Sequence, residues 1–408
     1  ERISVAMTNH HKKLLTELYI PICIAIILFF SIISLTSIEH FKDFGYVSLQ
    51  YFYWFNLIFF VVYLMLNKSS VDLKVFISFS GFLIIQIFNM YFNGDYFSFE
   101  RVIRITLFIV TIFLFTLIQW NKKTLLILSG LVSILIIYLF FNWFQTDFST
   151  YRFKSLFRNS NNFAILLFVL SYFVVLASFY FKHIIRYIHL IVLLMIIMLI
   201  YASNSRAIYL SITIVILTLL VFKFLPKISN KLFYIVMAGN ITLFLVALKS
   251  DTIPILGFLN DLSNKFLTKS FFNGRDYIWS DIFNEAVLRS PWFGYGYGVS
   301  ASHVSNINPS THNVYLQLLL ESGFIGLISF LIAIYFLWKL LLKNKHSIAG
   351  RLSIAYFLAI IVYINFELIL FPNTLATIAI FMWLIITFGI NFIENDKKRA
   401  RPLNRFSL

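Results

Sequence analysis

The sequence NFAILLFVLSYFVVLASFYF occupies residues 162–181 and contains no charged side chain. A helix needs about 20 predominantly apolar residues to cross the hydrocarbon core of a bilayer, and this stretch supplies them without interruption. It does not alternate between polar and apolar residues, as the strand of a membrane β-barrel would. The stretch therefore predicts a transmembrane α-helix.

Composition extends this prediction to the whole chain. Hydrophobic residues make up 60% of the 408 residues and charged residues only 12%, against roughly 45–50% and about 25% in soluble proteins. So few charges cannot cover a water-facing surface, which excludes a soluble enzyme, a disordered chain and a secreted disulfide scaffold. The single cysteine, Cys23, excludes an intramolecular disulfide. We expect an all-α polytopic integral membrane protein.

Apolar stretches recur along the chain, and twelve are long enough to be transmembrane helices. The first follows basic residues as a signal peptide would, but it has no small-x-small cleavage site, so we expect a retained helix. The expected spans are 18–36, 45–66, 73–92, 102–120, 124–144, 162–181, 184–202, 206–225, 231–248, 323–341, 352–370 and 374–393.

Lysine and arginine are distributed unevenly between alternate connections. If the N-terminus is cytoplasmic and the helices alternate, the inner connections carry the whole formal net charge of +16, and the outer ones sum to zero. This asymmetry predicts that both termini are cytoplasmic. It also explains the basic composition by membrane topology, without a nucleic-acid partner.

One connection is much longer than the others and divides the chain into three parts. Within it, apolar residues at helical spacing predict an amphipathic helix that starts near Gly274 and ends at Pro291, and a second helix is expected to begin near Asn313. The parts are helices one to nine over 1–248, the large outer loop over 249–322, and the last three helices with a basic cytoplasmic tail over 323–408.

Two arginines at outer helix ends are candidates for chemistry. Arg206 follows Ser205 at the start of a helix, where it either anchors that helix at the interface or meets a lipid phosphate. Arg275 stands in the first turn of the amphipathic helix, where the helix dipole disfavours a cation unless an anion binds there. The alternative for Arg275 is a surface ion pair with Asp276 or Asp281.

His312 follows a polar loop and precedes an apolar helix, so it is either a structural residue or a general base. Imidazole suits base catalysis because histidine ordinarily titrates near neutral pH. The sequence has no His, Cys or acid spacing typical of a metal site, and we expect no metal or other cofactor. Two acids near helix ends, Glu321 and Glu367, are further candidates because acids within a bilayer are often functional.

For other polar residues near the outer helix ends, a structural role explains their position at least as well as a functional one. Asn161 or Asn162 is expected to cap the helix that follows them, and the nearby Arg158 either binds a phosphate or ends its loop. Arg289 lies near the end of the amphipathic helix, where the helix dipole favours a cation.

These outer features together resemble the bacterial O-antigen ligase and polymerase family over about 203–328. The resemblance rests on the Ser-Arg pair, on Gly-Arg-x-x-x-Trp from Gly274 and on Pro-Trp-Phe-Gly-Tyr-Gly from Pro291. It continues with His-Asn-x-Tyr-Leu-x-x-Leu-x-Glu-x-Gly-x-x-Gly from His312, which is the most specific block. The Asn-Ser-Asn-Asn segment at 159–162 is similar to a family stretch but lacks its proline, so it is given no role.

The resemblance implies a GT-C-like membrane glycosyltransferase in the bacterial cytoplasmic membrane. It would transfer a glycan from a polyprenyl diphosphate on the outer side, without metal or nucleotide sugar. The resemblance implies that Arg206 and Arg275 bind the diphosphate, with Arg289 as a looser match, and that His312 is catalytic and acts on the acceptor hydroxyl. Expected substrate contacts are Asn313, Tyr315 and Arg158.

The leading hypothesis is an O-antigen or capsular polysaccharide polymerase, which moves a growing chain onto a new lipid-linked repeat unit. A ligase that transfers finished glycan to lipid A–core or to a protein shares this chemistry. A flippase or transporter is the alternative of another class, but the helix centres are almost charge-free and the outer loop is large. The implied partners are undecaprenyl-diphosphate-linked oligosaccharide donor and acceptor, membrane lipids and a chain-length regulator protein.

Overall fold

The computed structural model describes residues 14–67, 71–93, 98–149, 152–250, 274–303, 310–370 and 376–393, and single positions between 253 and 272. Within these residues the secondary structure is helical, with no strand. Among them, nine helices are long and apolar enough to cross a membrane. The expectation of a polytopic α-helical membrane protein is confirmed.

Every expected span falls on a helix. Helices α14 and α15 have 16 residues each, and α5 carries charged residues in its first turns, so twelve crossings and a GT-C-like fold stay predictions. The helices are α2 (Ile20–Phe30, extended by η1, Leu15–Tyr19, and η2, Ser31–Leu35), α3 (Glu39–Asn67), α4 (Leu73–Phe92), α5 (Phe99–Leu117), α6 (Lys122–Phe144), α7 (Ser160–Tyr180), α8 (His183–Ser203), α9 (Arg206–Phe224), α10 (Leu232–Leu248), α13 (Val314–Leu342), α14 (Ile348–Tyr363) and α15 (Ala376–Asn391).

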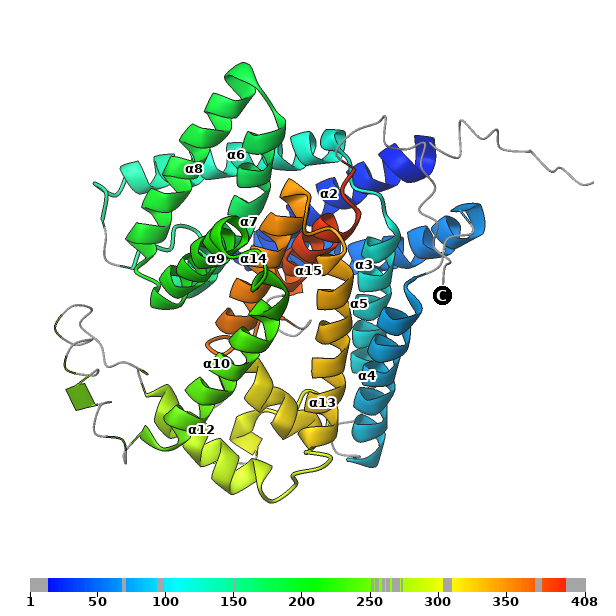
Figure 1. Cartoon of the computed structure of the whole chain (residues 1–408), viewed down its shortest axis with the longest axis vertical. Coiled ribbons are helices and arrows are strands. Elements are labelled where there is room, and N and C mark those ends of the chain that lie inside the picture. The colour runs from blue at the N-terminus through cyan, green and yellow to red at the C-terminus, as the bar shows by residue number, and fades with distance from the viewer. Residues whose placement is uncertain are drawn as a thin grey trace, which may run out of the picture.

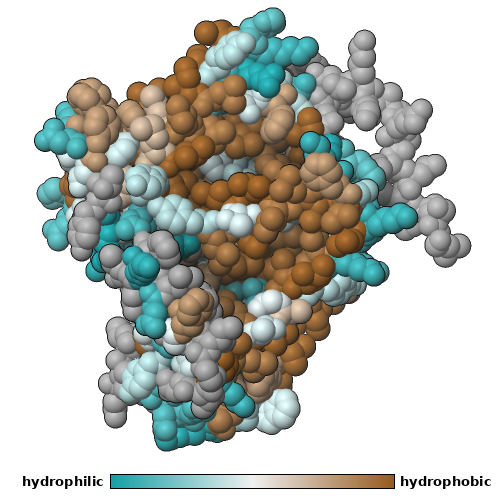
Figure 2. All heavy atoms as spheres, turned by 60° about the vertical axis from the view of Figure 1, so that its left-hand side comes forward, coloured by the Kyte–Doolittle hydropathy of each residue, from teal (hydrophilic) through white to brown (hydrophobic). Residues whose placement is uncertain are grey.

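Helices α7, α14 and α15 form the centre of the bundle, and most of their side chains are buried by protein. Helix α14 packs against α9 and α15, while α13 packs against α4 (Figure 1). Helices α3, α8, α9 and α10 instead expose many large apolar side chains. Figure 2 shows a broad apolar surface with hydrophilic residues mainly at its margins. Such a large exposed apolar surface is what a lipid-facing protein requires.

Helix α13 begins at Val314, close to the predicted start. Asn313 caps it, because its Oδ1 accepts the Leu316 N–H at 3.1 Å. The helix then continues into the span expected from 323, and Gly323, with φ of 61°, kinks it there. The first turns of α13 therefore lie within the range that was expected to be outer loop.

Helix α14 ends at Tyr363, whereas the sequence predicted a helix that continues to residue 370. The chain turns after Tyr363, and the Ile364 carbonyl accepts a hydrogen bond from Val314 N–H at 2.9 Å. The predicted boundary is wrong, because this contact with the start of α13 replaces the next helical turn. As a result, Glu367 lies on a non-helical segment beside α13.

The outer connection contains the expected amphipathic helix. Helix α12 spans Arg275–Ile282 and continues as a π-helical turn, η6, over Phe283–Val287. Its apolar face is buried, with Trp279, Ile282 and Ala286 each at most 1% exposed. This face packs against α10, whose end lies next to α12 in Figure 1.

The glycine-rich segment 291–296 runs along the kink of α13 and bonds to backbone groups of that helix. For example, Tyr295 N–H donates to the Leu320 carbonyl at 2.9 Å. The close approach requires glycine on both sides. Gly294 has φ of 66° and Gly323 φ of 61°, and a Cβ on either would lie within 2.6 Å of backbone atoms of the other segment. The Pro-Trp-Phe-Gly-Tyr-Gly motif and the His-Asn motif are thus parts of one structural unit.

Contacts between connections fall into two sets, one at each end of the helices. At one end, Ser37 N–H donates to the Leu156 carbonyl at 2.8 Å. At the other, Lys345 Nζ donates to Asn230 Oδ1 at 2.9 Å. Both contacts join connections that an alternating topology places on the same side. Which end faces the cytoplasm stays a prediction from the positions of lysine and arginine.

Candidate functional site

Glu367 is the centre of a polar cluster built from separate parts of the chain. Its Oε1 accepts hydrogen bonds from Arg275 Nη2 at 3.3 Å and from Asn161 Nδ2 at 3.1 Å. His312 Nδ1 lies 3.3 Å from Oε2. Ser205 Oγ donates to Asn161 Oδ1 at 3.3 Å. We call these five residues the Glu367 cluster.

The members of the Glu367 cluster differ in how far they reach solvent. The side chains of Glu367 and Arg275 are 15% and 19% exposed, while that of His312 is 41% exposed. Water screens the Glu367–Arg275 pair less than it would screen a pair at an open surface. The imidazole is the most accessible of the three groups.

The contact with Glu367 orients the His312 ring. An ionised carboxylate only accepts hydrogen bonds, so a neutral imidazole bonded to it through Nδ1 carries its proton there. Nε2 then has a lone pair that can take a proton from a hydroxyl group. In Ser-His-Asp triads a carboxylate holds the histidine tautomer in the same way. His312 therefore has the environment of an oriented general base.

Arg275 is the first residue of α12, as the sequence predicted. The preceding Gly274 has φ of 79°, a left-handed conformation that glycine adopts easily and that turns the chain into the helix. The Arg275 guanidinium pairs with Glu367 and lies over the Phe366 ring, 5.7 Å from its centroid. The alternative of a surface pair with an acid of its own helix is wrong.

A buried network holds the loop that carries His312. Trp279 Nε1 donates to the Thr311 carbonyl at 2.9 Å. Gln317 accepts from Thr311 Oγ1 at 3.1 Å and donates to Glu321 Oε1 at 2.8 Å. His312 has φ of 47°, a left-handed conformation that costs a non-glycine residue roughly 1–2 kcal/mol. The surrounding contacts offset this cost, so the imidazole is presented by a preorganised loop.

A further buried contact fixes the glycine-rich segment from the other side. Arg101 Nη1, in the first turn of α5, donates to the Tyr297 carbonyl at 3.3 Å. Burial raises the pKa of the Tyr297 phenol above its ordinary value, so this ring stays neutral. The segment that follows α12 is therefore held between α13 and α5.

Arg206 is the first residue of α9 and lies beside the Glu367 cluster. The positive charges of Arg275 and Arg152 both act on Arg206. Three cations at this end of the helices thus influence one another electrostatically, and the carboxylate of Glu367 is bonded to one of them, Arg275. Arginines whose positive charges act on one another make this end a favourable place for an anion.

Two arginines named from the sequence lie elsewhere. Arg289 pairs with Glu285, one turn earlier in the same helical segment, and its side chain is 68% exposed. Arg158 is exposed on the connection before α7. Within the described part of the chain, neither side chain bonds to a residue of the Glu367 cluster, so a diphosphate-binding role for Arg289 and a substrate contact for Arg158 stay predictions.

Asn313 and Tyr315, the other expected substrate contacts, are bonded inside the protein. Asn313 is fully buried as the cap of α13, and a substrate role would require that cap to open. Tyr315 Oη donates to the Ile361 carbonyl at 3.0 Å and accepts from Asn240 Nδ2 at 3.2 Å. In this structure Asn313 caps α13, and Tyr315 joins α13 to α14 and α10.

The cap of α7 differs from the prediction. Asn159 caps the helix, because its Oδ1 accepts the Asn162 N–H at 2.7 Å. The expectation that Asn161 or Asn162 is the cap is wrong. Since Asn159 provides the cap, the Asn161 side chain is available to bond Glu367. The Asn-Ser-Asn-Asn segment, to which the sequence assigned no role, thus contributes to the cluster.

Three residues of this end were not assigned to the site from sequence. Glu367 had a usable signal, since it is an acid near the end of an apolar helix. Asn161 stands among other asparagines, and Arg152 lies in a connection with several basic residues, so nothing local distinguishes either one. Groups of three or more His, Cys or acidic residues suited to a metal ion do not occur among the described residues.

Fold and site together define a class: a polytopic membrane protein with clustered arginines and an oriented histidine at one end of its helices. Residues 190–331 match the family model described as O-antigen ligase, and this match supports assigning the chain to the O-antigen ligase and polymerase family. The matched range contains Arg206, Arg275 and His312, whereas Asn161 and Glu367 lie outside it. No curated protein matches the chain.

Proposed function

We propose that this protein is a polysaccharide polymerase that transfers a glycan from a polyprenyl diphosphate to a hydroxyl of a lipid-linked repeat unit. The observation that carries the proposal is the contact of His312 and Arg275 with one carboxylate, Glu367. This contact supports a general base and a diphosphate-binding cation acting side by side. The match of residues 190–331 to the O-antigen ligase family model supports the same chemistry.

In the proposed reaction, His312 Nε2 takes the proton of the acceptor hydroxyl while the hydroxyl oxygen bonds to the anomeric carbon of the donor. The bond between that carbon and the phosphate oxygen breaks, and polyprenyl diphosphate leaves with the electron pair. Arg275 and Arg206 offset the negative charge that develops on the leaving group. Glu367 keeps the imidazole oriented and stabilises it once protonated.

The charges of the site suit a diphosphate diester, which carries two negative charges. Arg152, Arg206 and Arg275 are positive and influence one another electrostatically, and Glu367 offsets one of them. Arginines placed in this way would stabilise a doubly charged anion. The polyprenyl tail would lie on the apolar surface exposed by α9 and α10, where each buried CH2 group contributes about 0.8 kcal/mol.

A ligase is the second candidate, and the description of the matching family, O-antigen ligase, favours it. The same residues would perform the same transfer, and only the acceptor would differ: lipid A–core or a protein instead of a lipid-linked repeat unit. A chain-length regulator protein is a proposed partner of the polymerase alone. The two candidates are therefore separated by their products rather than by the site.

The deciding experiment incubates the purified full chain with defined undecaprenyl-diphosphate-linked repeat units and no added metal. A ladder of products indicates a polymerase, and transfer only to a second lipid or to a protein indicates a ligase. The absence of any covalent product contradicts both and favours a flippase or transporter.

The proposed mechanism predicts that His312→Ala and Arg275→Ala abolish chain extension while the protein still inserts into the membrane. General-base assistance is worth about 100- to 10,000-fold in rate, so the loss at His312 should be severe. Full-length glycan made by either variant contradicts the mechanism.

A further inference from the structure

A hollow of about 220 Å³ opens between the α9–α10 and α13–α14 connections. Lys345 Nζ donates to Asn230 Oδ1 at 2.9 Å and thereby links the two connections. We call this cavity the basic hollow. The residues that line it are Phe222, Pro226, Ser229, Lys345, His346 and Arg351.

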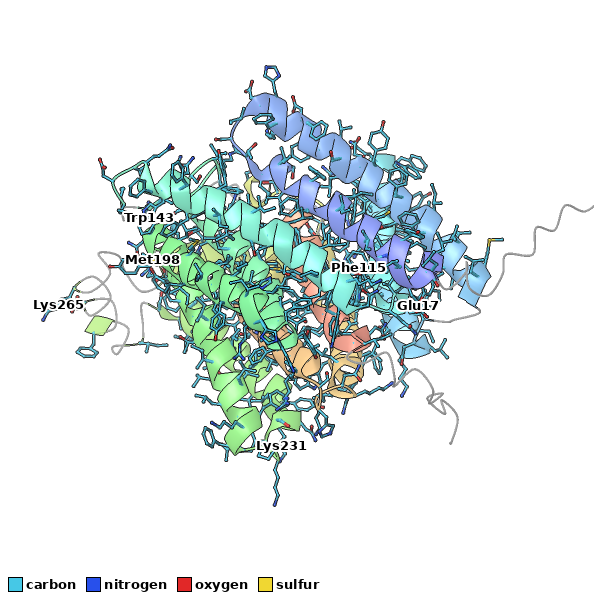
Figure 3. The ribbon with its side chains drawn as sticks, turned by 90° about the horizontal axis from the view of Figure 1, so that it is seen from above. Glu17, Phe115, Trp143, Met198, Lys231 and Lys265 are labelled. Atoms are coloured by element: carbon cyan, nitrogen blue, oxygen red, sulfur yellow. The ribbon has the colours of Figure 1, made fainter. Side chains whose placement is uncertain are left out.

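The two segments that form the basic hollow carry several basic residues and no acid. Neither 221–235 nor 339–355 contains an aspartate or a glutamate. Lys223 and Lys227 lie in the first of these segments, together with Lys231, which projects away from the protein in Figure 3. The lining itself contains Lys345, His346 and Arg351 and no acid, so an anion held between these side chains is stabilised.

The basic hollow and the Glu367 cluster lie at opposite ends of the same helices. Helix α9 begins at Arg206 and reaches the hollow at Phe222, while α14 carries Arg351 in its first turn and ends shortly before Glu367. The 19 residues of α9 extend over about 28 Å, close to the thickness of a bilayer core. The hollow therefore lies at the other membrane face, which is the cytoplasmic one in the expected topology.

Apolar side chains border the basic hollow and continue beyond it. Phe222 and Pro226 form part of its wall. Next to them, Phe224 is 64% exposed and Leu225 is 51% exposed. Basic groups beside apolar surface at a helix end suit a ligand with an anionic headgroup and acyl chains. A free phosphate would use only the basic part of this surface.

We propose that the basic hollow binds the phosphate group of an anionic phospholipid, with Lys345 and Arg351 as the principal contacts. A guanidinium can donate paired hydrogen bonds to phosphate oxygens, and an ammonium adds a second positive charge. Basic pockets between membrane helices on the cytoplasmic side recognise lipid headgroups in this way. The site is separate from the Glu367 cluster and does not depend on the proposed glycosyl transfer.

The test uses the purified full chain, stripped of bound lipid, and measures lipid binding by native mass spectrometry. Phosphatidylglycerol should bind in preference to phosphatidylcholine, which has no net charge. The double variant Lys345→Gln, Arg351→Gln should weaken phosphatidylglycerol binding about tenfold or more, because two cations next to the phosphate are lost. The control Lys223→Gln, Lys231→Gln removes the same charge outside the lining and should change binding by less than about threefold.

Three outcomes overturn the site. The first is an equal loss in the control variant, which would show a general charge effect, and the second is equal binding of phosphatidylcholine. The third is displacement of the lipid by millimolar inorganic phosphate, which would assign the hollow to free phosphate. If thermal unfolding shows that the double variant is not folded, the single variant Arg351→Gln takes its place, because this exposed side chain can be replaced with little effect on packing.

Discussion

The two ends of helices α9, α13 and α14 carry similar basic side chains in different surroundings. In the Glu367 cluster, Arg275 and His312 are both bonded to one largely buried carboxylate. In the basic hollow, Lys345 and Arg351 belong to a lining that includes no carboxylate. A bonded cation has a defined direction and can take part in chemistry, whereas several cations without an acid create a field that attracts an anion. Whether a basic side chain has a carboxylate partner therefore matters more for its role than whether it is arginine, lysine or histidine.

Among the variants that test this comparison, Glu367→Gln should have the largest effect. The amide keeps the size of the side chain but loses the charge that pairs with Arg275 and orients His312, so glycosyl transfer should fall about 100-fold or more. Product formation by the purified protein measures this effect. Glu285→Gln is the control, since Glu285 pairs with Arg289 at an exposed site, and it should leave the rate within about twofold. Near-normal activity of Glu367→Gln would show that the carboxylate does not set the Glu367 cluster apart from the basic hollow.

The kink of α13 at Gly323, at the same end of the helices as the Glu367 cluster, should also tolerate substitution poorly. In Gly323→Ala the new Cβ would meet the Trp292 backbone at 2.2 Å and a φ of 61° would be strained, so stability should fall by about 2–3 kcal/mol. Gly130→Ala is the control, because a Cβ there meets nothing within 4 Å and alanine favours the helix by about 0.5–1 kcal/mol. Thermal unfolding in detergent measures both. Equal stability of the two variants would contradict the role assigned to the kink.

Arg275→Lys should have a smaller but clear effect. Lysine keeps the charge but cannot donate in the planar geometry of a guanidinium, so we expect transfer to slow about tenfold. Arg289→Lys should leave the rate unchanged, since Arg289 pairs with Glu285 at an exposed position. Steady-state rates with the same donor and acceptor compare the two variants. A similar loss in both would support the sequence-based assignment of Arg289 to the diphosphate.

The smallest effect is expected for an ion pair near the basic hollow. Lys343 Nζ lies 3.4 Å from Asp72 Oδ2, and the two side chains are 66% and 32% exposed. Lys343→Gln should therefore cost less than about 1 kcal/mol of stability, because solvent screens such pairs. Thermal unfolding in detergent again provides the measurement. A loss of several kcal/mol would show that this end, too, depends on bonded pairs.

Helix positions were predictable because a membrane-spanning helix requires a long apolar run, which any local window of sequence reveals. The end of α14 was not predictable in the same way. Residues 364–370 are nearly as apolar as the helix before them, and the helix ends there because Ile364 bonds to Val314, a residue from another part of the chain. A local pattern cannot report that contact.

Part of the candidate site could also be predicted from local sequence. Arg206, Arg275 and His312 stand out because polar residues are rare near the helix ends of such an apolar chain. The two arginines of the outer helix could not be ranked from sequence. Arg275 reaches Glu367 and Arg289 does not, because the start of α12, and not its continuation, faces the segment after α14.

Hydropathy, charge asymmetry and motif spacing are thus enough to establish a polytopic membrane protein, its approximate helices and three of its candidate site residues. Each of these sequence patterns is recognised within a short stretch of the chain. The partner of those residues required the packed fold, because Glu367 is separated from Asn161, Arg275 and His312 by 206, 92 and 55 positions. Hydrogen bonds of about 3 Å between such distant residues depend on how the helices pack, and no local pattern encodes that distance.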